Sequence, residues 1–215
     1  MELTEFTPSS ALVTVVLLSL APFAAVMLTS FTKIVVVLSL VRNALGLQQV
    51  PPNLVLNGLA IILTFYVMYP TSQLVMERLS GVENITDSTD SMFAAANLAK
   101  EPLRDFMLKH STVEEREFFL DSIQQMSADR SALTANDLVV VIPAFTISEL
   151  TSAFRIGFMI FLPFIVIDLV VANILMAMGM MMLSPTIVSL PFKILLFVMV
   201  EGWAKLAHGL VTSYI

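Results

Sequence analysis

The stretch that decides the fold runs from residue 138 to residue 178 and reads LVVVIPAFTISELTSAFRIGFMIFLPFIVIDLVVANILMAM. It is apolar for most of its length, as membrane helices are, yet Glu149, Arg155 and Asp168 lie inside it. A charge at the centre of a bilayer costs roughly 2.5–3.5 kcal/mol on insertion scales. We therefore expect these side chains to face other helices, partner subunits or a water-filled pore.

Three further hydrophobic segments accompany this one. Residues 11–32 and 53–76 contain no charged side chain, and 11–32 is long enough to cross about 30 Å of hydrocarbon. Prolines interrupt the apolar runs and predict kinked helices. The sequence therefore predicts an all-α, polytopic membrane protein of kinked helical hairpins with about four hydrophobic segments. The interrupting prolines are Pro22, Pro70, Pro143 and Pro163, and the last segment, 186–215, also carries Lys193, Glu201, Lys205 and His208.

The composition agrees with a membrane protein. The chain of 215 residues is 57% hydrophobic and 13% charged, whereas soluble domains are about 45–50% apolar and about 25% charged. It contains no cysteine, which excludes disulfides, cysteine-ligated metals and thiol nucleophiles.

One polar block interrupts the hydrophobic chain. Residues 77–137 hold twelve acidic and six basic residues, which gives this block the whole net charge of −6. Leu103, Phe106 and Met107 follow helical spacing, and Ser111 with Glu114 has the spacing of a capping box at the start of another helix. We expect a hydrophobic hairpin in 1–76, a small helical insertion in 77–137, and a second hydrophobic hairpin with a methionine-rich loop in 138–215.

The charges near the first connector predict the orientation of the chain. Lys33 and Arg42 flank a connector without acidic residues, which the positive-inside rule places in the cytoplasm. The N-terminus and the 77–137 insertion would then be extracytoplasmic. The N-terminus lacks the basic region of a signal peptide, so we interpret the first hydrophobic stretch as retained.

Signatures of enzyme chemistry are missing from the sequence. His110 and His208 lie far apart, and the sequence contains no metal-ligand spacing, glycine-rich phosphate loop or nucleophile elbow. A basic surface for nucleic acid is missing as well. We expect no catalytic residue, no cofactor, no metal site and no nucleic-acid partner.

Two features remain as candidates for function. The string from Met176 to Pro185 places three consecutive methionines between Gly179 and a proline. Methionine packs adaptably, so a loop could present these side chains as a deformable apolar seal, or they could be ordinary residues of a hydrophobic helix. The charges of the second half could form a polar network that fixes subunit register or lines a conduit, or they could reach the membrane surface from helix ends. Among these charges, Glu201 and Lys205 have the spacing to pair within one helix.

Several short motifs follow one another along the chain: FTKI at 31–34, LVRNALG at 40–46, QQVPPN at 48–53, LPFIVID at 162–168, the methionine string at 177–185, LPFK at 190–193 and EGW at 201–203. Together these motifs resemble the FliP/SctR family of type III secretion export-apparatus proteins. The resemblance covers nearly the whole chain outside the acidic insertion, in the family's order.

The resemblance implies a core subunit of the export gate, through which unfolded polypeptides cross the bacterial inner membrane. It implies a homopentamer with S- and T-type subunits, near U- and V-type subunits, basal-body rings and membrane lipid, in a complex that projects toward the periplasm. It further implies a pore gasket of Met180, Met181 and Met182 and an inter-subunit polar network of Glu149, Asp168 and Lys193. Flagellar members usually carry a signal peptide and a longer N-terminus, so we expect the virulence-associated branch.

Two other functions fit the residues alone. One is a small-molecule or ion transporter that uses the charged helices as a relay. The other is a purely structural membrane scaffold whose methionines only pack.

Overall fold

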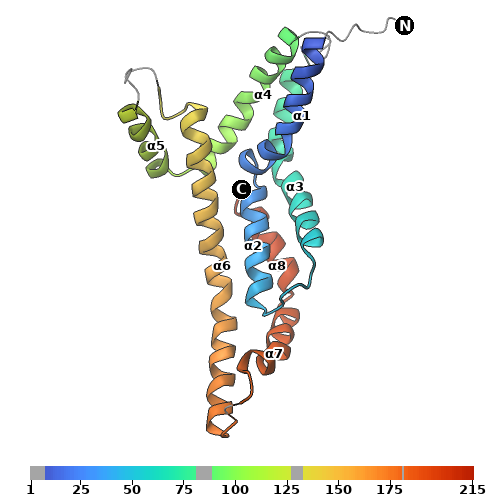
Figure 1. The fold of residues 1–215 in the computed structure, drawn as a ribbon, viewed down its shortest axis with the longest axis vertical. Helices are drawn as coiled ribbons and strands as arrows, with labels where there is room; N and C mark the ends of the chain where they lie inside the picture. Colours follow the sequence, from blue (N-terminus) through green and yellow to red (C-terminus); the bar gives the residue numbers. More distant parts are fainter. Residues whose placement is uncertain (1–7, 81–88, 127–132, 181) are drawn as a thin grey trace, which may run out of the picture. The chain divides into compact units, whose positions relative to one another are not determined.

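The computed structural model describes residues 8–80, 89–126, 133–180 and 182–215, and every regular element in these ranges is an α-helix (Figure 1). The predicted all-α fold is confirmed, including the helical character of the polar insertion, which holds α4 and α5. In chain order the helices are α1 Pro8–Leu28, α2 Phe31–Ala44, α3 Asn53–Leu79, α4 Thr89–His110, α5 Val113–Met126, α6 Leu138–Ala177, α7 Pro185–Met199 and α8 Gly202–Thr212.

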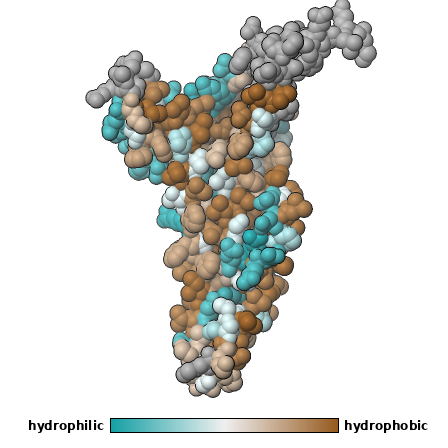
Figure 2. Space-filling model, viewed as in Figure 1, coloured by the Kyte–Doolittle hydropathy of each residue, from teal (hydrophilic) through white to brown (hydrophobic). Residues whose placement is uncertain are grey.

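Two to four membrane spans fit the helices of the described ranges. By length and composition, α3 and α6 can each cross a bilayer alone. Two more spans result if each bent pair counts as one: the end of α1 with α2, bent by 79°, and α7 with α8, bent by 60°. This is the polytopic arrangement that the four hydrophobic segments predict. Figure 2 shows hydrophobic residues over much of the visible face, as expected for surfaces in contact with lipid or other subunits.

The chain divides into two compact units. The first comprises residues 1–32 and 67–149, and the second comprises 33–66 and 150–215. Helices α3 and α6 contribute residues to both units. The division into 1–76, 77–137 and 138–215 stays a prediction about the organisation of the chain.

In the first unit, the end of α4 contacts the start of α6. Phe106 and Phe145 are both almost fully buried and meet edge to face, with ring centroids 5.8 Å apart. Met107, which follows Phe106 in the sequence, is 1% exposed. The helical spacing of this segment predicts that both residues lie on its buried face. Such an aromatic pair contributes about 0.5–1.5 kcal/mol beyond the area that it buries.

Helix α5 begins one residue later than the predicted capping box. Thr112, not Ser111, is the capping residue: its Oγ1 accepts a hydrogen bond from the backbone N–H of Glu115 at 3.4 Å. Its own N–H donates to the Ser148 hydroxyl on α6 at 3.0 Å, which joins the cap to the neighbouring helix. The Ser111 hydroxyl instead donates to the carbonyl of Leu108.

The sharp bend in the first hydrophobic segment lies after α1 rather than at Pro22. The helix continues through Pro22 to Leu28, and the 79° change of direction falls at residues 29 and 30. The Thr29 hydroxyl donates to the carbonyl of Ala25 and accepts a hydrogen bond from the N–H of Phe31. This side chain satisfies backbone groups that the break releases, so the chain can turn without leaving them unpaired.

The second unit is built on close contact between α2 and α6. An added Cβ at Gly157 of α6 would lie 2.3 Å from Cδ1 and 3.1 Å from Cβ of Leu40 on α2, so a side chain at this position would require Leu40 to shift. Lys33 is buried, and its ammonium lies 4.1 Å from the centre of the Tyr214 ring near the C-terminus. The other buried residues of α2 are aliphatic: Ile34, Val37, Leu38, Val41 and Ala44.

Candidate functional site

The methionine string begins where α6 ends in a Schellman motif. Gly179 has a φ of 71°, its N–H donates to the carbonyl of Met176, and the N–H of Met180 donates to the carbonyl of Leu175. This hydrogen-bond pattern closes the helix with glycine in the left-handed conformation. Because Pro185 then starts α7, the connection is short and fixed at both ends.

The turn between α6 and α7 exposes large apolar side chains. Met180 is 41% exposed and Met182 is fully exposed, while Met181 lies outside the described residues. Met176, Met178 and Leu183 are each more than half exposed as well. We call the segment 176–183 the methionine turn. Flexible apolar side chains gathered at one turn can adapt to one another or to a passing chain.

An ion pair joins the two helices that flank this turn. Lys193 Nζ of α7 lies 2.6 Å from Oδ2 of Asp168 on α6. The hydroxyl of Ser189 donates to the other carboxylate oxygen, Oδ1, at 2.5 Å. Ser189 and Lys193 are four residues apart on α7, so both lie on the face toward Asp168. Both oxygens of the carboxylate therefore bind α7.

The electrostatics of this ion pair are asymmetric. The Lys193 side chain is 5% exposed, whereas the Asp168 side chain is 31% exposed. A buried ammonium costs several kcal/mol to desolvate unless an opposite charge and hydrogen bonds compensate it. Lys193 thus depends on Asp168, while the partly exposed carboxylate can also reach solvent or a neighbouring protein.

Of the three residues predicted to form a polar network, the structure brings together Asp168 and Lys193. It also adds Ser189, which the sequence analysis missed although it stands one helical turn before Lys193. Glu149 is 2% exposed and belongs to the first unit, whereas the ion pair belongs to the second. The inter-subunit role of the three residues stays a prediction.

The other charged residues of the second half lie at the surface. Glu201 does not belong to the helix of Lys205: it precedes α8 at the N-cap, with a φ of 52°, and both residues are exposed. Arg155 is exposed on α6. These positions match the interpretation that some charges of this half reach solvent rather than join a network.

The elbow between α7 and α8 is a cluster of aromatic rings around one glycine. The Phe197 ring meets Trp203 edge to face at 5.3 Å and lies 6.4 Å from the Phe164 ring of α6. An added Cβ at Gly202 would lie 2.3 Å from the Phe197 ring, so glycine permits the close packing at this bend. The family motif at 201–203 therefore marks the elbow.

In the described part of the chain, three or more metal-ligating side chains gather nowhere. The features with functional potential are therefore the methionine turn, the ion pair beside it and the aromatic elbow.

Comparison with known proteins assigns the family. The FliP family model matches residues 14–210. The hypersensitivity response secretion protein HrcR of Ralstonia nicotianae is 50% identical over 210 residues, covering 96% of this chain and 97% of that protein. The Yop proteins translocation protein R of Yersinia pestis is 52% identical, with 92% of each chain covered. The flagellar biosynthetic protein FliP of Bacillus subtilis is 46% identical, with 91% of this chain and 87% of that protein covered. The chain therefore belongs to the FliP family.

Proposed function

We propose that this chain is a core subunit of a type III secretion export gate and forms part of the protein-conducting channel for unfolded substrates. Relatives about half identical along nearly their whole length are named as secretion or translocation proteins, which supports a secretion-apparatus subunit. Members of this family are structural components of such an apparatus, so the chain is not an enzyme.

The proposed channel seal rests on one observation, the exposure of the methionine turn. Met180 and Met182 project from a short connection fixed by Gly179 and Pro185, and they are 41% and fully exposed. An exposed apolar patch of this kind marks a surface that other protein or lipid covers. Met180, Met181 and Met182 of several copies around one axis would supply that cover for each other and close the pore as a gasket.

The ion pair supports this role by holding the flanking helices together. Lys193 and Ser189 bind Asp168 of α6, so these contacts join the two helices that flank the methionine turn. The exposed third of the Asp168 side chain leaves room for a contact with a neighbouring subunit. Glu149 is 2% exposed within the first unit, so it offers almost no surface to a neighbouring subunit, and its place in the inter-subunit polar network stays a prediction.

The proposed setting is a homopentamer in the bacterial inner membrane, assembled with S- and T-type subunits and projecting toward the periplasm. U- and V-type subunits, basal-body rings, membrane lipid and the translocating polypeptide are its other neighbours. The predicted topology places the connector between α2 and α3 in the cytoplasm and the insertion with α4 and α5 outside. Of the described charges near that connector, Lys33 and Arg42 favour this orientation.

Purification with coexpressed export subunits tests the proposal. The expected product is a stable complex with other small membrane proteins, whose projection images show fivefold copies of this chain around a closed centre. Loss of protein secretion when the chain is deleted, restored by the wild-type chain, is expected alongside. A stable monomer or homodimer that transports a small solute would contradict the gate and favour a transporter.

A further inference from the structure

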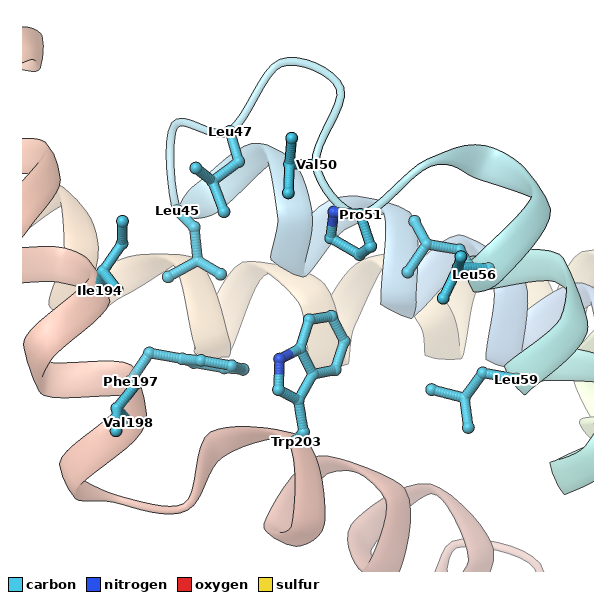
Figure 3. Close-up of a pocket in the computed structure, with 11 residues that line it drawn as sticks. Leu45, Leu47, Val50, Pro51, Leu56, Leu59, Ile194, Phe197, Val198 and Trp203 are labelled. Carbon is cyan, nitrogen blue, oxygen red and sulfur yellow. The ribbon is translucent and has the colours of Figure 1, made fainter.

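An apolar cavity of about 500 Å³ lies in the second unit, between the α2–α3 connector and the α7–α8 elbow (Figure 3). Figure 3 shows the Trp203 ring projecting toward the connector that carries Pro51. The cavity volume is within the range of ligand sites, about 300–1,000 Å³. Its wall carries no charged side chain, and it is formed by Leu45, Leu47, Val50, Pro51, Val55, Leu56, Leu59, Ile194, Phe197, Val198 and Trp203.

A positive charge lies directly beside this apolar wall. Nη1 of Arg42 donates to the carbonyl of Pro51 at 3.3 Å and to Oδ1 of Asn53 at 2.5 Å. Its Nε is buried and has no hydrogen-bond partner among the described residues, whereas the side chain as a whole is partly exposed. Residues 43–53 contain no acidic side chain that could neutralise the guanidinium.

This combination fits an amphiphile with a negative head. A wholly apolar cavity gives water no hydrogen-bond partner, and it offers no group that could orient a polar solute. A partly exposed guanidinium is suited to a phosphate, and basic sites at helix ends bind anionic lipid headgroups. Trp203 is 37% exposed at the cavity, and tryptophan favours the boundary between headgroups and acyl chains.

We propose that this cavity binds an anionic phospholipid, with an acyl chain against Trp203 and the phosphate on Arg42. The bound lipid would fill the space between the connector and the elbow. The proposal requires the cavity to reach the edge of a bilayer, and it does not require the methionine turn to close a channel.

The chain's single tryptophan makes the test direct, because Trp203 lies in the cavity wall. The full-length chain is reconstituted in vesicles that contain increasing fractions of phosphatidylglycerol or phosphatidylcholine, brominated at the same acyl carbons. Bromine quenches nearby tryptophan fluorescence. The expected result is saturable quenching, with half-quenching at a mole fraction about fivefold lower for phosphatidylglycerol, as one arginine near an anionic lipid provides.

Three variants separate headgroup recognition from other effects. Arg42→Gln should abolish the preference for the anionic lipid. Asn53→Ala removes the contact that holds the guanidinium but keeps its charge, so the preference should persist. Arg78→Gln, the matched control, removes the same charge from an exposed position of the first unit and should also leave the preference unchanged.

Three results would overturn the proposal. Equal quenching curves for the two lipids would mean that the site does not select a headgroup. An equal loss of preference in Arg42→Gln and Arg78→Gln would assign the effect to overall surface charge. Protection of Trp203 from both brominated lipids would mean that protein, rather than lipid, covers the cavity.

Discussion

Lys193 Nζ lies 2.6 Å from Asp168 Oδ2, and this contact joins α7 to α6 across 25 residues of sequence. The ammonium is nearly inaccessible, whereas about a third of the carboxylate side chain is exposed. Removing the carboxylate and removing the ammonium should therefore cost different amounts of stability.

Removing the carboxylate should cost more than removing the ammonium. Asp168→Asn leaves a buried positive charge without a counterion, and we expect it to lower the free energy of unfolding by about 3 kcal/mol. Lys193→Met leaves a carboxylate that reaches solvent, and we expect a loss of about 1 kcal/mol. Thermal unfolding in detergent measures both variants, with the exposed Lys205→Met as control. Equal losses would contradict the asymmetry.

The aromatic elbow predicts that two glycines of α8 respond oppositely to the same substitution. Gly202→Ala places a Cβ within 2.6 Å of three atoms of the Phe197 ring, and we expect it to destabilise the chain by about 1–3 kcal/mol. At Gly209 the position of the added Cβ is open, so Gly209→Ala should be neutral or stabilising by up to about 1 kcal/mol.

A second substitution tests whether the Phe197 ring causes the instability of Gly202→Ala. Phe197→Leu should recover part of the stability that Gly202→Ala loses, because the smaller side chain frees the space. Unfolding of the two single variants and the double variant forms a thermodynamic cycle. Strictly additive losses would show that the Phe197 ring is not what excludes a side chain at Gly202.

The start of α5 distinguishes two adjacent hydroxyls. Thr112→Ala removes the acceptor for the N–H of Glu115 and should destabilise the first unit by about 1 kcal/mol. Ser111→Ala, the matched control, removes a hydroxyl that bonds only to the carbonyl of Leu108 and should cost less. Chemical unfolding measures the free energy of unfolding of the two variants. A larger loss for Ser111→Ala would favour Ser111 as the capping residue, as the sequence predicts.

The N-cap of α6 predicts a local pH dependence. The N–H of Thr134 donates to Asp137 Oδ2 at 2.6 Å, and its hydroxyl donates at 3.0 Å. These hydrogen bonds, aided by Arg104 and Lys100, lower the pKa of Asp137 below 3.8. Because the folded pKa is depressed, the stabilisation is present above pH 3.8 and is lost as pH falls through the folded value.

Carboxyl NMR of labelled aspartate measures this titration. Asp137 should titrate below the pKa of an unstructured aspartate. Thr134→Ala keeps the backbone N–H and removes only the hydroxyl, so it should raise the pKa of Asp137 part of the way toward 3.8. An unchanged pKa of Asp137 in Thr134→Ala would show that the Thr134 hydroxyl does not contribute to the lowering.

The sequence predicts the class of the fold because hydrophobic length and spacing are local properties. The all-α, polytopic arrangement and the helices of the insertion follow from such patterns. The bend after Leu28 does not, because it depends on Thr29 hydroxyl contacts rather than on the proline that the sequence makes conspicuous. The capping shift from Ser111 to Thr112 likewise depends on a contact with Ser148 on another helix.

The candidate site shows the same limit. Charges inside hydrophobic segments predict that Asp168 and Lys193 need partners, but spacing along the chain does not say which ones. The structure pairs them within one chain and adds Ser189, whose role becomes visible only when α6 and α7 lie side by side. The methionine string is evident in the sequence, whereas its exposure follows from the Schellman end of α6 at Gly179.

Ionic leak through the purified, reconstituted complex tests the proposed export channel most directly. Replacing Met180, Met181 and Met182 with alanine should leave assembly intact and raise conductance to small ions, because the apolar closure is removed. A matched triple variant at Met27, Met159 and Met199, which are 43%, 65% and 75% exposed away from the turn, should leave conductance unchanged. Unchanged conductance in the variant at Met180–Met182, with the complex assembled, would contradict the methionine seal.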